Sequence, residues 1–501
     1  MLSIRALQLG DNDFSTQYSL PPEVIWNYEP ESLLAEEKEY DIAIIDRPLS
    51  DAECRHLNRI VRAHCLFLLA DQSVTASMNW LMQGRAGRLM EREELSKFLS
   101  VRIRNFYGKP YGEKFDPSAV AVSEAFHGSE CWNGHSELIL RGDFGSAMQQ
   151  ILCWRNTIPV ESGQAIDFWL EYRKDPGVHV QLDILLFQPG SIADTQMRWR
   201  FSEEQMQDVV HIDNTMKSGP IFVTLNACGS GELRLIALHD RYSRRGEGAF
   251  FPGSDRIVTS DREEVFCYFD PGDLKPPLCV YFSGYRTQEG FEGYRMMRSF
   301  GCPFLLISDP RLEGGDFYIG SEEYEAGIRD SIRRYLDKLG FTRKDLVLSG
   351  LSMGSFGALY YGTMLQPKEI IVGKPLVSLG DMAEAERLQR PGGFPTSLDI
   401  LWKEYHCLDR KAIDSMNARF WNRFDRADWS ETEFIVAYMI EDDYDRSGYD
   451  RLLSHIESNG SRIIGKGLHG RHNDNTRGIV YWFLSQYQRI LSVEYHRQKQ
   501  D

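Results

Sequence analysis

The alternation of apolar and polar residues is most regular from about residue 250 to the end of the chain. Short apolar runs there have the length and composition of buried strands: "EVFCYFD", "PLCVYF", "PFLLIS", "DLVLSG", "EIIVGKPLV", "FIVAYMI" and "RIIGKG". The stretch "SEEYEAGIRDSIRRYLDKLG" repeats apolar residues at steps of three and four, which predicts an amphipathic helix ending at Gly340. Further helical stretches follow, and an irregular insertion precedes "FIVAYMI". Residues 246–501 are therefore predicted to form a doubly wound α/β domain.

Two smaller units precede this domain. Residues 1–115 contain the runs "IRALQLG", "YDIAIIDRP" and "HCLFLLAD" between helix-compatible stretches, which predicts a small α/β unit with a parallel sheet. The segment "QLGDND" has a single glycine, so a dinucleotide-binding fingerprint is missing and partner docking is the favoured interpretation.

Residues 116–245 consist mostly of short runs with the composition of β-strands. Runs such as "HSELILRG", "AIDFWLEYRK" and "ELRLIALHD" are joined by turn residues, which predicts a β-sandwich. Sandwich modules often bind carbohydrate, and Trp132, Trp154 and Trp169 are candidates for stacking on sugar rings. The simpler interpretation places these tryptophans in the core or at an interface.

Charge and composition narrow the possible partners. The net charge of −16 argues against a nucleic-acid or anionic-lipid footprint. The amino terminus has no apolar signal-peptide core, and no run approaches the roughly 18 residues that span a bilayer. Nine cysteines are scattered singly, as small hydrophobes of a reducing compartment are. We therefore expect a cytoplasmic protein that is at most peripheral to the inner face of the membrane.

The segment "LVLSGLSMGSFGALYYG" carries the clearest chemistry. An apolar strand precedes Gly350, and a helix-compatible stretch rich in small residues follows Ser352. A nucleophile elbow, the strand–turn–helix of α/β-hydrolases, needs this arrangement because the turn is cramped and only small neighbours fit. Ser352 is therefore predicted to be a nucleophile.

A serine nucleophile needs a base and an acid, which follow it in the chain order Ser, acid, His in this architecture. Glu441, Asp442 and Asp443 lie at the carboxyl end of the next-to-last predicted strand, where such sheets gather catalytic groups. His469 and His472 follow the last strand, and His472 is favoured because it directly precedes predicted helix-capping residues. The choice among the three acids stays open at this point.

An acyl-transfer site also needs N–H donors for an oxyanion. The candidates are the amides of Met353 and Tyr285, with Gly284 allowing the sharp turn in "FSGYR". No motif indicates a metal site, and "DPRLEGGDFYIG" lacks the ligand spacing of a calcium loop, so we interpret it as an active-site rim. No phosphate-binding loop argues for a coenzyme A site, so no bound cofactor is expected and the acyl donor, acetyl-CoA included, is left open.

The segments "GLSMGSFGALYYG" and "GRHNDNTRGIVYWFL" resemble the second accessory Sec-system protein of Gram-positive bacteria, and the resemblance runs the whole chain. It implies a carbohydrate-esterase-like domain that acts as an O-acetyltransferase on N-acetylglucosamine of a serine-rich repeat glycoprotein adhesin. It also implies a role in adhesin export with companion accessory secretory proteins one and three and an accessory Sec ATPase.

By matching motifs, the resemblance makes Ser352 the nucleophile and His472 the base. The resemblance implies a glutamate as the acid of the triad, whereas this chain has Glu441 and Asp442 side by side. Spacing favours Asp442, with Glu441 in reserve. Two alternative hypotheses remain: a non-catalytic export scaffold, and a stand-alone carboxylesterase or carbohydrate deacetylase.

Overall fold

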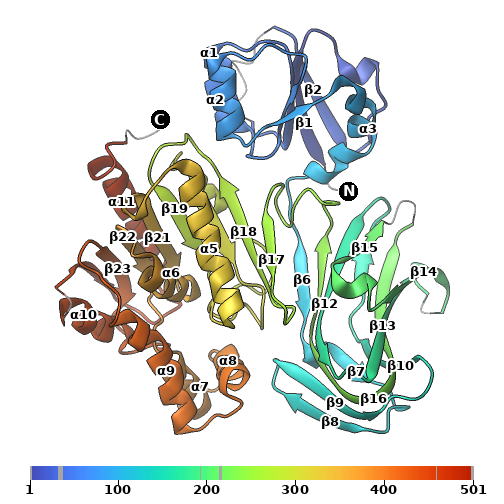
Figure 1. The fold of residues 1–501 in the computed structure, drawn as a ribbon, viewed down its shortest axis with the longest axis vertical. Coiled ribbons are helices and arrows are strands. Elements are labelled where there is room, and N and C mark those ends of the chain that lie inside the picture. The colour runs from blue at the N-terminus through green and yellow to red at the C-terminus, as the bar shows by residue number, and fades with distance from the viewer. Residues whose placement is uncertain (1–2, 32–37, 192, 214–216, 459, 498–501) are drawn as a thin grey trace.

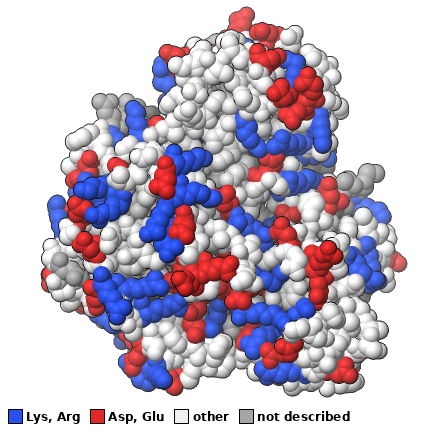
Figure 2. All heavy atoms as spheres, viewed as in Figure 1, with Lys and Arg blue, Asp and Glu red and all other residues white. Residues whose placement is uncertain are grey.

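The computed structural model describes residues 3–31, 38–191, 193–213, 217–458 and 460–497. The chain forms an amino-terminal α/β domain, a β domain and a carboxyl-terminal α/β domain (Figure 1). Lys and Arg side chains are interspersed with Asp and Glu over the face drawn in Figure 2. Among the described helices, none combines the length and the hydropathy that a bilayer crossing requires.

The amino-terminal domain is built on a five-stranded parallel sheet of order β2-β1-β3-β4-β5. Its strands are β1 (Ile4–Gly10), β2 (Val24–Glu29), β3 (Ile42–Asp46), β4 (Leu66–Leu69) and β5 (Arg88–Met90). Its helices are α1 (Asp51–Ile60), α2 (Ala76–Gly84) and α3 (Leu95–Ser100). The central strands β3 and β4 are buried along their whole length, which explains their continuous apolar runs.

The β domain contains an 11-stranded network organised around the 24-residue strand β16 (Gly219–Tyr242). The first half of β16 pairs with β10, β11 and β13, and its second half pairs with β6, β9 and β12. The other strands are β6 (Gly112–Phe115), β7 (Val120–Val122), β8 (Ser129–Asn133), β9 (Glu137–Asp143), β10 (Gln149–Trp154), β11 (Ile158–Val160), β12 (Ala165–Lys174), β13 (Val178–Phe187), β14 (Thr195–Ser202) and β15 (Val210–Asp213). Because β6 pairs with β16, this domain begins a few residues before the predicted boundary at 115/116.

The three tryptophans singled out in this domain have different environments. Trp154 and Trp169 are buried, and the guanidinium groups of Arg256 and Arg262 lie 4.2 and 4.0 Å from the centre of the Trp169 ring. Both rings are therefore packing residues rather than sugar platforms. Trp132, on β8, remains exposed.

The carboxyl-terminal domain has an eight-stranded sheet of order β17-β18-β20-β19-β21-β22-β23-β24. Its first two strands, β17 (Asp255–Val258) and β18 (Glu264–Asp270), are antiparallel. The other six are parallel: β19 (Leu278–Phe282), β20 (Phe304–Ser308), β21 (Leu346–Leu351), β22 (Glu369–Gly373), β23 (Glu433–Met439) and β24 (Arg462–Leu468). The carboxyl ends of the six parallel strands therefore meet at one edge of the sheet.

Helices cover both faces of this sheet. Residues of α5 (Glu322–Leu339), α6 (Met353–Leu365) and α10 (Gly448–Ser458) share one core with the strands. Residues of α4 (Tyr294–Arg298) and α11 (Thr476–Val493) share the core of the opposite face.

The insertion between β22 and β23 was predicted to be irregular, and that prediction is wrong. It forms α7 (Leu379–Leu388), α8 (Thr396–Tyr405) and α9 (Arg410–Phe424), a helical cap beside the strand ends (Figure 1). In α9, Ile413, Met416 and Phe420 are buried at steps of three and four residues, the helical spacing that the sequence interpretation overlooked. The cap also reaches the β domain, because the His135 N–H donates to Asp399 of α8 (3.0 Å).

A buried charge cluster joins β16 to the carboxyl-terminal domain. Glu171, His239 and Glu264 offer ligand-type atoms within 4.8 Å of one another, but both carboxylate oxygens of Glu264 accept hydrogen bonds from Arg241 (2.9 and 2.6 Å). His239 Nδ1 lies 2.5 Å from Glu289 and its Nε2 lies 3.3 Å from Glu171. Guanidinium and imidazolium groups thus balance the carboxylates at this interface.

The stability of this interface is predicted to depend on His239. Burial alone would lower the pKa of His239, but Glu289 and Glu171 outweigh it and raise the pKa to about 9. A raised folded-state pKa stabilises the fold fully below the unfolded pKa of about 6.5 and loses that contribution as pH rises through 9, on the order of 3 kcal/mol. Between pH 7 and 9.5 we therefore expect the melting temperature to fall by several degrees more in the wild type than in His239→Gln. Equal pH slopes would contradict this, and exposed His179→Gln is the control.

Candidate active site

Ser352 stands at the tight turn between β21 and α6. Its backbone has φ 54° and ψ −120°, a conformation that a non-glycine residue adopts only under strain. A Cβ on Gly350 would lie 2.2 Å from the Gly354 carbonyl oxygen, and one on Gly354 would lie 2.1 Å from the Phe282 carbonyl oxygen. The small residues around Ser352 are therefore required by the close approach of helix and strands.

A chain of hydrogen bonds runs from Ser352 to a carboxylate. Ser352 Oγ lies 2.8 Å from His472 Nε2, and His472 Nδ1 lies 2.9 Å from Asp442 Oδ2. The three residues follow β21, β24 and β23, at the edge where the parallel strands end. The side chains of His472 and Asp442 are only 2% and 9% exposed, so water does not compete for these hydrogen bonds.

The three consecutive acids after β23 have three different partners. Glu441 contacts the exposed ring of His469 (3.0 Å) and accepts from the Gly470 N–H (2.6 Å). Asp442 contacts His472 Nδ1, whereas Asp443 accepts from the His472 backbone N–H (3.0 Å). The structure thus brings Asp442 to the Ser352–His472 pair and places Glu441 and His469 outside it. The role of Asp443 in holding the His472 backbone was not foreseen from the sequence.

The "FSGYR" turn lies against the elbow, but Gly284 is needed there for a different reason than predicted. Its φ is not in the left-handed region. A Cβ on Gly284 would instead lie 3.2 Å from the Leu351 carbonyl oxygen and 3.1 Å from Glu292, whose carboxylate accepts from the Gly284 N–H (2.7 Å). The Gly284 amide is therefore occupied. Met353 is the first residue of α6, where a backbone N–H has no acceptor within its own helix.

The segment "DPRLEGGDFYIG" borders the same edge. Gly314 approaches the ring of Tyr285 so closely that a Cβ there would lie 2.2 Å from it, and a Cβ on Gly315 would lie 2.5 Å from the Met353 side chain. Asp309 shapes this segment, because its Oδ2 accepts from the N–H groups of Asp316 (3.1 Å) and Tyr318 (3.0 Å). The segment thus packs on both residues predicted to supply the oxyanion donors.

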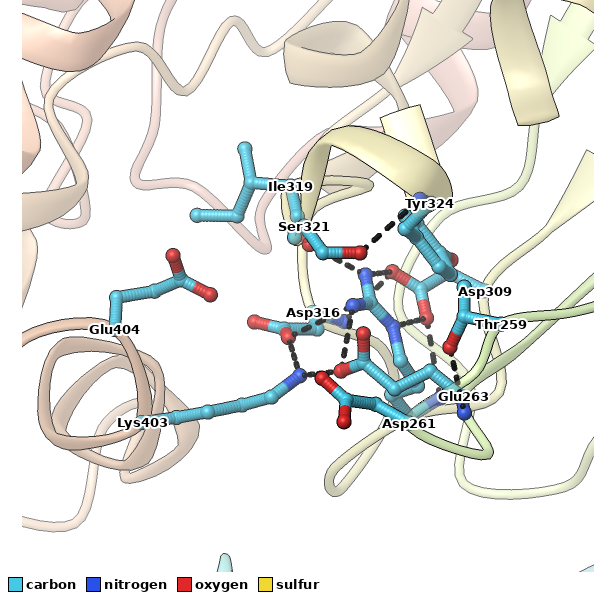
Figure 3. Close-up of polar contacts among 12 residues, drawn as sticks. Thr259, Asp261, Glu263, Asp309, Asp316, Ile319, Ser321, Tyr324, Lys403 and Glu404 are labelled. Atoms are coloured by element: carbon cyan, nitrogen blue, oxygen red, sulfur yellow. Dashed lines mark hydrogen bonds and ion pairs between the residues drawn. The ribbon is translucent and has the colours of Figure 1, made fainter. Parts of the chain in front are cut away.

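Arg311 holds the same segment through a buried charge cluster, of which Figure 3 labels Asp309, Glu263, Tyr324 and Lys403. Its guanidinium bonds Asp309 through Nε (2.9 Å) and Nη2 (2.8 Å), lies 3.2 Å from Glu263 and stacks 3.5 Å from the centre of the Tyr324 ring. Lys403 of cap helix α8 adds an ion pair to Glu263 (2.5 Å). Burial opposes ionisation of Glu263, but Lys403 and Arg311 hold its pKa well below the usual range. The cluster joins the cap to the segment that packs on Tyr285 and Met353.

Replacing Arg311 by methionine is expected to destabilise the chain by about 3–5 kcal/mol, because buried carboxylates would lose their counter-charge. The measurement is chemical unfolding followed by fluorescence. Partly exposed Arg329→Met, which removes an ion pair with Asp330, is the control and should change stability by less than about 0.5 kcal/mol. A matching small effect for both variants would contradict the role of the cluster.

Comparisons with known proteins match nearly the whole chain to one family of proteins. The family model described as the accessory Sec system GspB-transporter matches residues 4–497. Accessory Sec system proteins of Streptococcus gordonii and Staphylococcus aureus are each 37% identical; the alignments cover 99% and 98% of this chain and 99% and 97% of those proteins. A chain in the Glycosylation Associate Protein (Gap123) complex from Streptococcus agalactiae is 33% identical with a TM-score of 0.87, over 99% of both chains. These matches confirm the resemblance, and the chain belongs to the accessory Sec system GspB-transporter family.

Proposed function

We propose that the chain is a serine O-acetyltransferase of the α/β-hydrolase, carbohydrate-esterase-like type, acting on N-acetylglucosamine of a serine-rich repeat glycoprotein adhesin within the accessory Sec export system. The observation that carries the catalytic part is the hydrogen-bonded chain Ser352–His472–Asp442 at a strained elbow. The sugar acceptor comes from the family resemblance alone.

In the first half-reaction, Ser352 Oγ attacks the acyl carbonyl of the donor while His472 Nε2 takes the hydroxyl proton. Asp442 orients the ring and stabilises the imidazolium. The N–H groups of Met353 and Tyr285 are proposed to stabilise the oxyanion, since the Gly284 amide already donates to Glu292. His472 then returns the proton to the leaving group, which leaves an acetyl ester on Ser352.

In the second half-reaction, a sugar hydroxyl attacks this ester. His472 takes the hydroxyl proton and returns it to Ser352 as the acetyl group moves to the sugar. Attack by water instead would make the chain a carboxylesterase or carbohydrate deacetylase, so acceptor binding decides between transfer and hydrolysis.

Labelling with a serine-directed fluorophosphonate tests the nucleophile. We expect the probe to modify Ser352, identified by peptide mass spectrometry, and to fail with His472→Ala. Modification of another serine, or equal labelling of both proteins, would contradict the assignment.

A second role as an export scaffold is supported by a separate feature. No residue in the described parts of the first two domains is assigned to the reaction above, and the matching Streptococcus agalactiae chain was solved in a complex. We propose docking to companion accessory secretory proteins one and three, and to the accessory Sec ATPase, in the cytoplasm or at the inner face of the membrane. Co-purification with these proteins, and adhesin export by a Ser352→Ala strain, would separate the scaffold from the enzyme.

A further inference from the structure

A tyrosine ring lies parallel to the imidazole of His472. The ring of Tyr444 and that of His472 have centroids 4.3 Å apart and an interplanar angle of 5°. Tyr444 lies two residues after Asp442, in the loop that leaves β23. No step of the proposed reaction uses it.

Tyr444 also contacts Asp442, the carboxylate that is hydrogen-bonded to His472. The Tyr444 backbone N–H donates to Asp442 Oδ1 (2.8 Å), the oxygen that His472 does not contact. The Tyr444 hydroxyl accepts from Asn473 (3.1 Å), the residue after His472. One residue therefore touches the acid, the histidine ring and the loop that bears the histidine.

The cap holds Tyr444 from another direction. The segment between α7 and α8 contributes Arg390, whose guanidinium carbon lies 4.1 Å from the centre of the Tyr444 ring, and Phe394, which stacks on the ring at 5.6 Å. Arg390 also pairs with Asp443 (3.1 Å), and the Tyr444 hydroxyl donates to the Gly393 carbonyl (3.2 Å). The position of the Tyr444 ring is thus fixed by one segment that precedes β23 in the sequence and by another that follows it.

Hydrogen bonds alone do not fully orient His472. Bonds at Nδ1 and Nε2 hold the imidazole only while both are formed, and lengthening of either bond lets the ring rotate about its Cβ–Cγ bond, which displaces Nε2. A flat ring stacked in parallel opposes that rotation, because turning the imidazole about its Cβ–Cγ bond would bring the edge of the ring into the tyrosine face. Reactions of positioned groups are sensitive to such changes, since a misplacement of about 1 Å can cost about 100-fold in rate.

We propose that Tyr444 is a positioning residue that limits rotation of the His472 imidazole about its Cβ–Cγ bond and thereby keeps Nε2 aimed at Ser352. The proposal rests on the proposed function only where activity is the readout, because ring orientation can be measured without turnover. The stacked ring, not the hydroxyl, carries the effect.

Three variants test this proposal. Tyr444→Leu removes the flat ring, Tyr444→Phe keeps the ring and removes the hydroxyl, and Tyr405→Leu changes a half-buried tyrosine of cap helix α8 as the control. The first readout is kcat and KM for a small acetyl ester together with the rate of fluorophosphonate labelling. The second is the downfield Nδ1 proton resonance of His472, observed by nuclear magnetic resonance with nitrogen-15-labelled histidine.

We expect Tyr444→Leu to lower kcat and the labelling rate by about 10- to 100-fold with KM within about 2-fold, and to weaken the Nδ1 resonance. Tyr444→Phe and Tyr405→Leu should stay within about 3-fold of the wild type and keep the resonance. If Tyr444→Leu does not fold, Tyr444→Met, a flexible side chain of similar volume, carries the same expectation.

Two results would overturn the proposal: wild-type rates and resonance in Tyr444→Leu, or an equal loss in Tyr444→Phe. A wild-type protein that neither turns over nor labels would instead overturn the proposed function. The Nδ1 resonance of His472 alone would then decide whether Tyr444 has the positioning role.

Discussion

Replacing Ser352 by alanine is expected to abolish acyl transfer, with kcat for a small acetyl ester reduced by at least about 10⁴-fold. The reason is that the hydroxyl is the group that forms the hydrogen bond with His472 Nε2, and no acyl-enzyme can form without it. The fold should persist because the Ser352 backbone N–H keeps its hydrogen bond to the Gly373 carbonyl (2.8 Å). Steady-state kinetics and circular dichroism measure the two effects.

Ser485→Ala is the matched control for this experiment. The Ser485 hydroxyl donates to a carbonyl within helix α11, away from the strand ends, so both activity and fold should be unchanged. Activity of Ser352→Ala within about 10-fold of the wild type would show that another group carries the reaction.

The second large effect concerns the acid. Asp442→Asn is expected to lower kcat by about 10³–10⁴-fold, because an amide can present its N–H₂ to His472 Nδ1 and favour the wrong tautomer of the ring. The neighbouring Glu441→Gln changes a carboxylate whose hydrogen-bond partners among the described residues are the exposed His469 and the Gly470 amide, so kcat should stay within about 2-fold. The two substitutions remove the same charge one residue apart, which makes each the control for the other.

The opposite order of effects would contradict this assignment. A large loss in Glu441→Gln with an active Asp442→Asn would mean that the loop after β23 rearranges during the reaction and brings the glutamate to His472. Kinetics of both variants over pH 5–9 distinguish a missing acid from a shifted pH optimum.

The elbow could be predicted from sequence because its signal is local, and the histidine because its place in the chain order is fixed in this architecture. Small residues around Ser352 are demanded by backbone contacts within a few residues, and the position of His472 after the last strand follows from chain order. The acid could not be chosen in the same way. The side chains of three consecutive acidic residues point in different directions, and only the path of the loop decides which of them contacts the His472 ring.

Contacts between distant segments were also beyond sequence reasoning. Gly284 was interpreted as a turn glycine, but the structure requires it because a carboxylate and a carbonyl from elsewhere in the chain pack against it. Arg390 and Tyr444 are 54 residues apart in number and meet only because the cap folds back over the strand ends. Such contacts have no periodicity for a single sequence to reveal.

The proposed activity is acetylation of a protein-bound sugar through Ser352. The most direct test is mass spectrometry of adhesin glycans from cells that carry either the wild-type chain or Ser352→Ala at equal abundance. We expect acetylated N-acetylglucosamine in the wild type and its absence in the variant. Equal acetylation in both strains would contradict it.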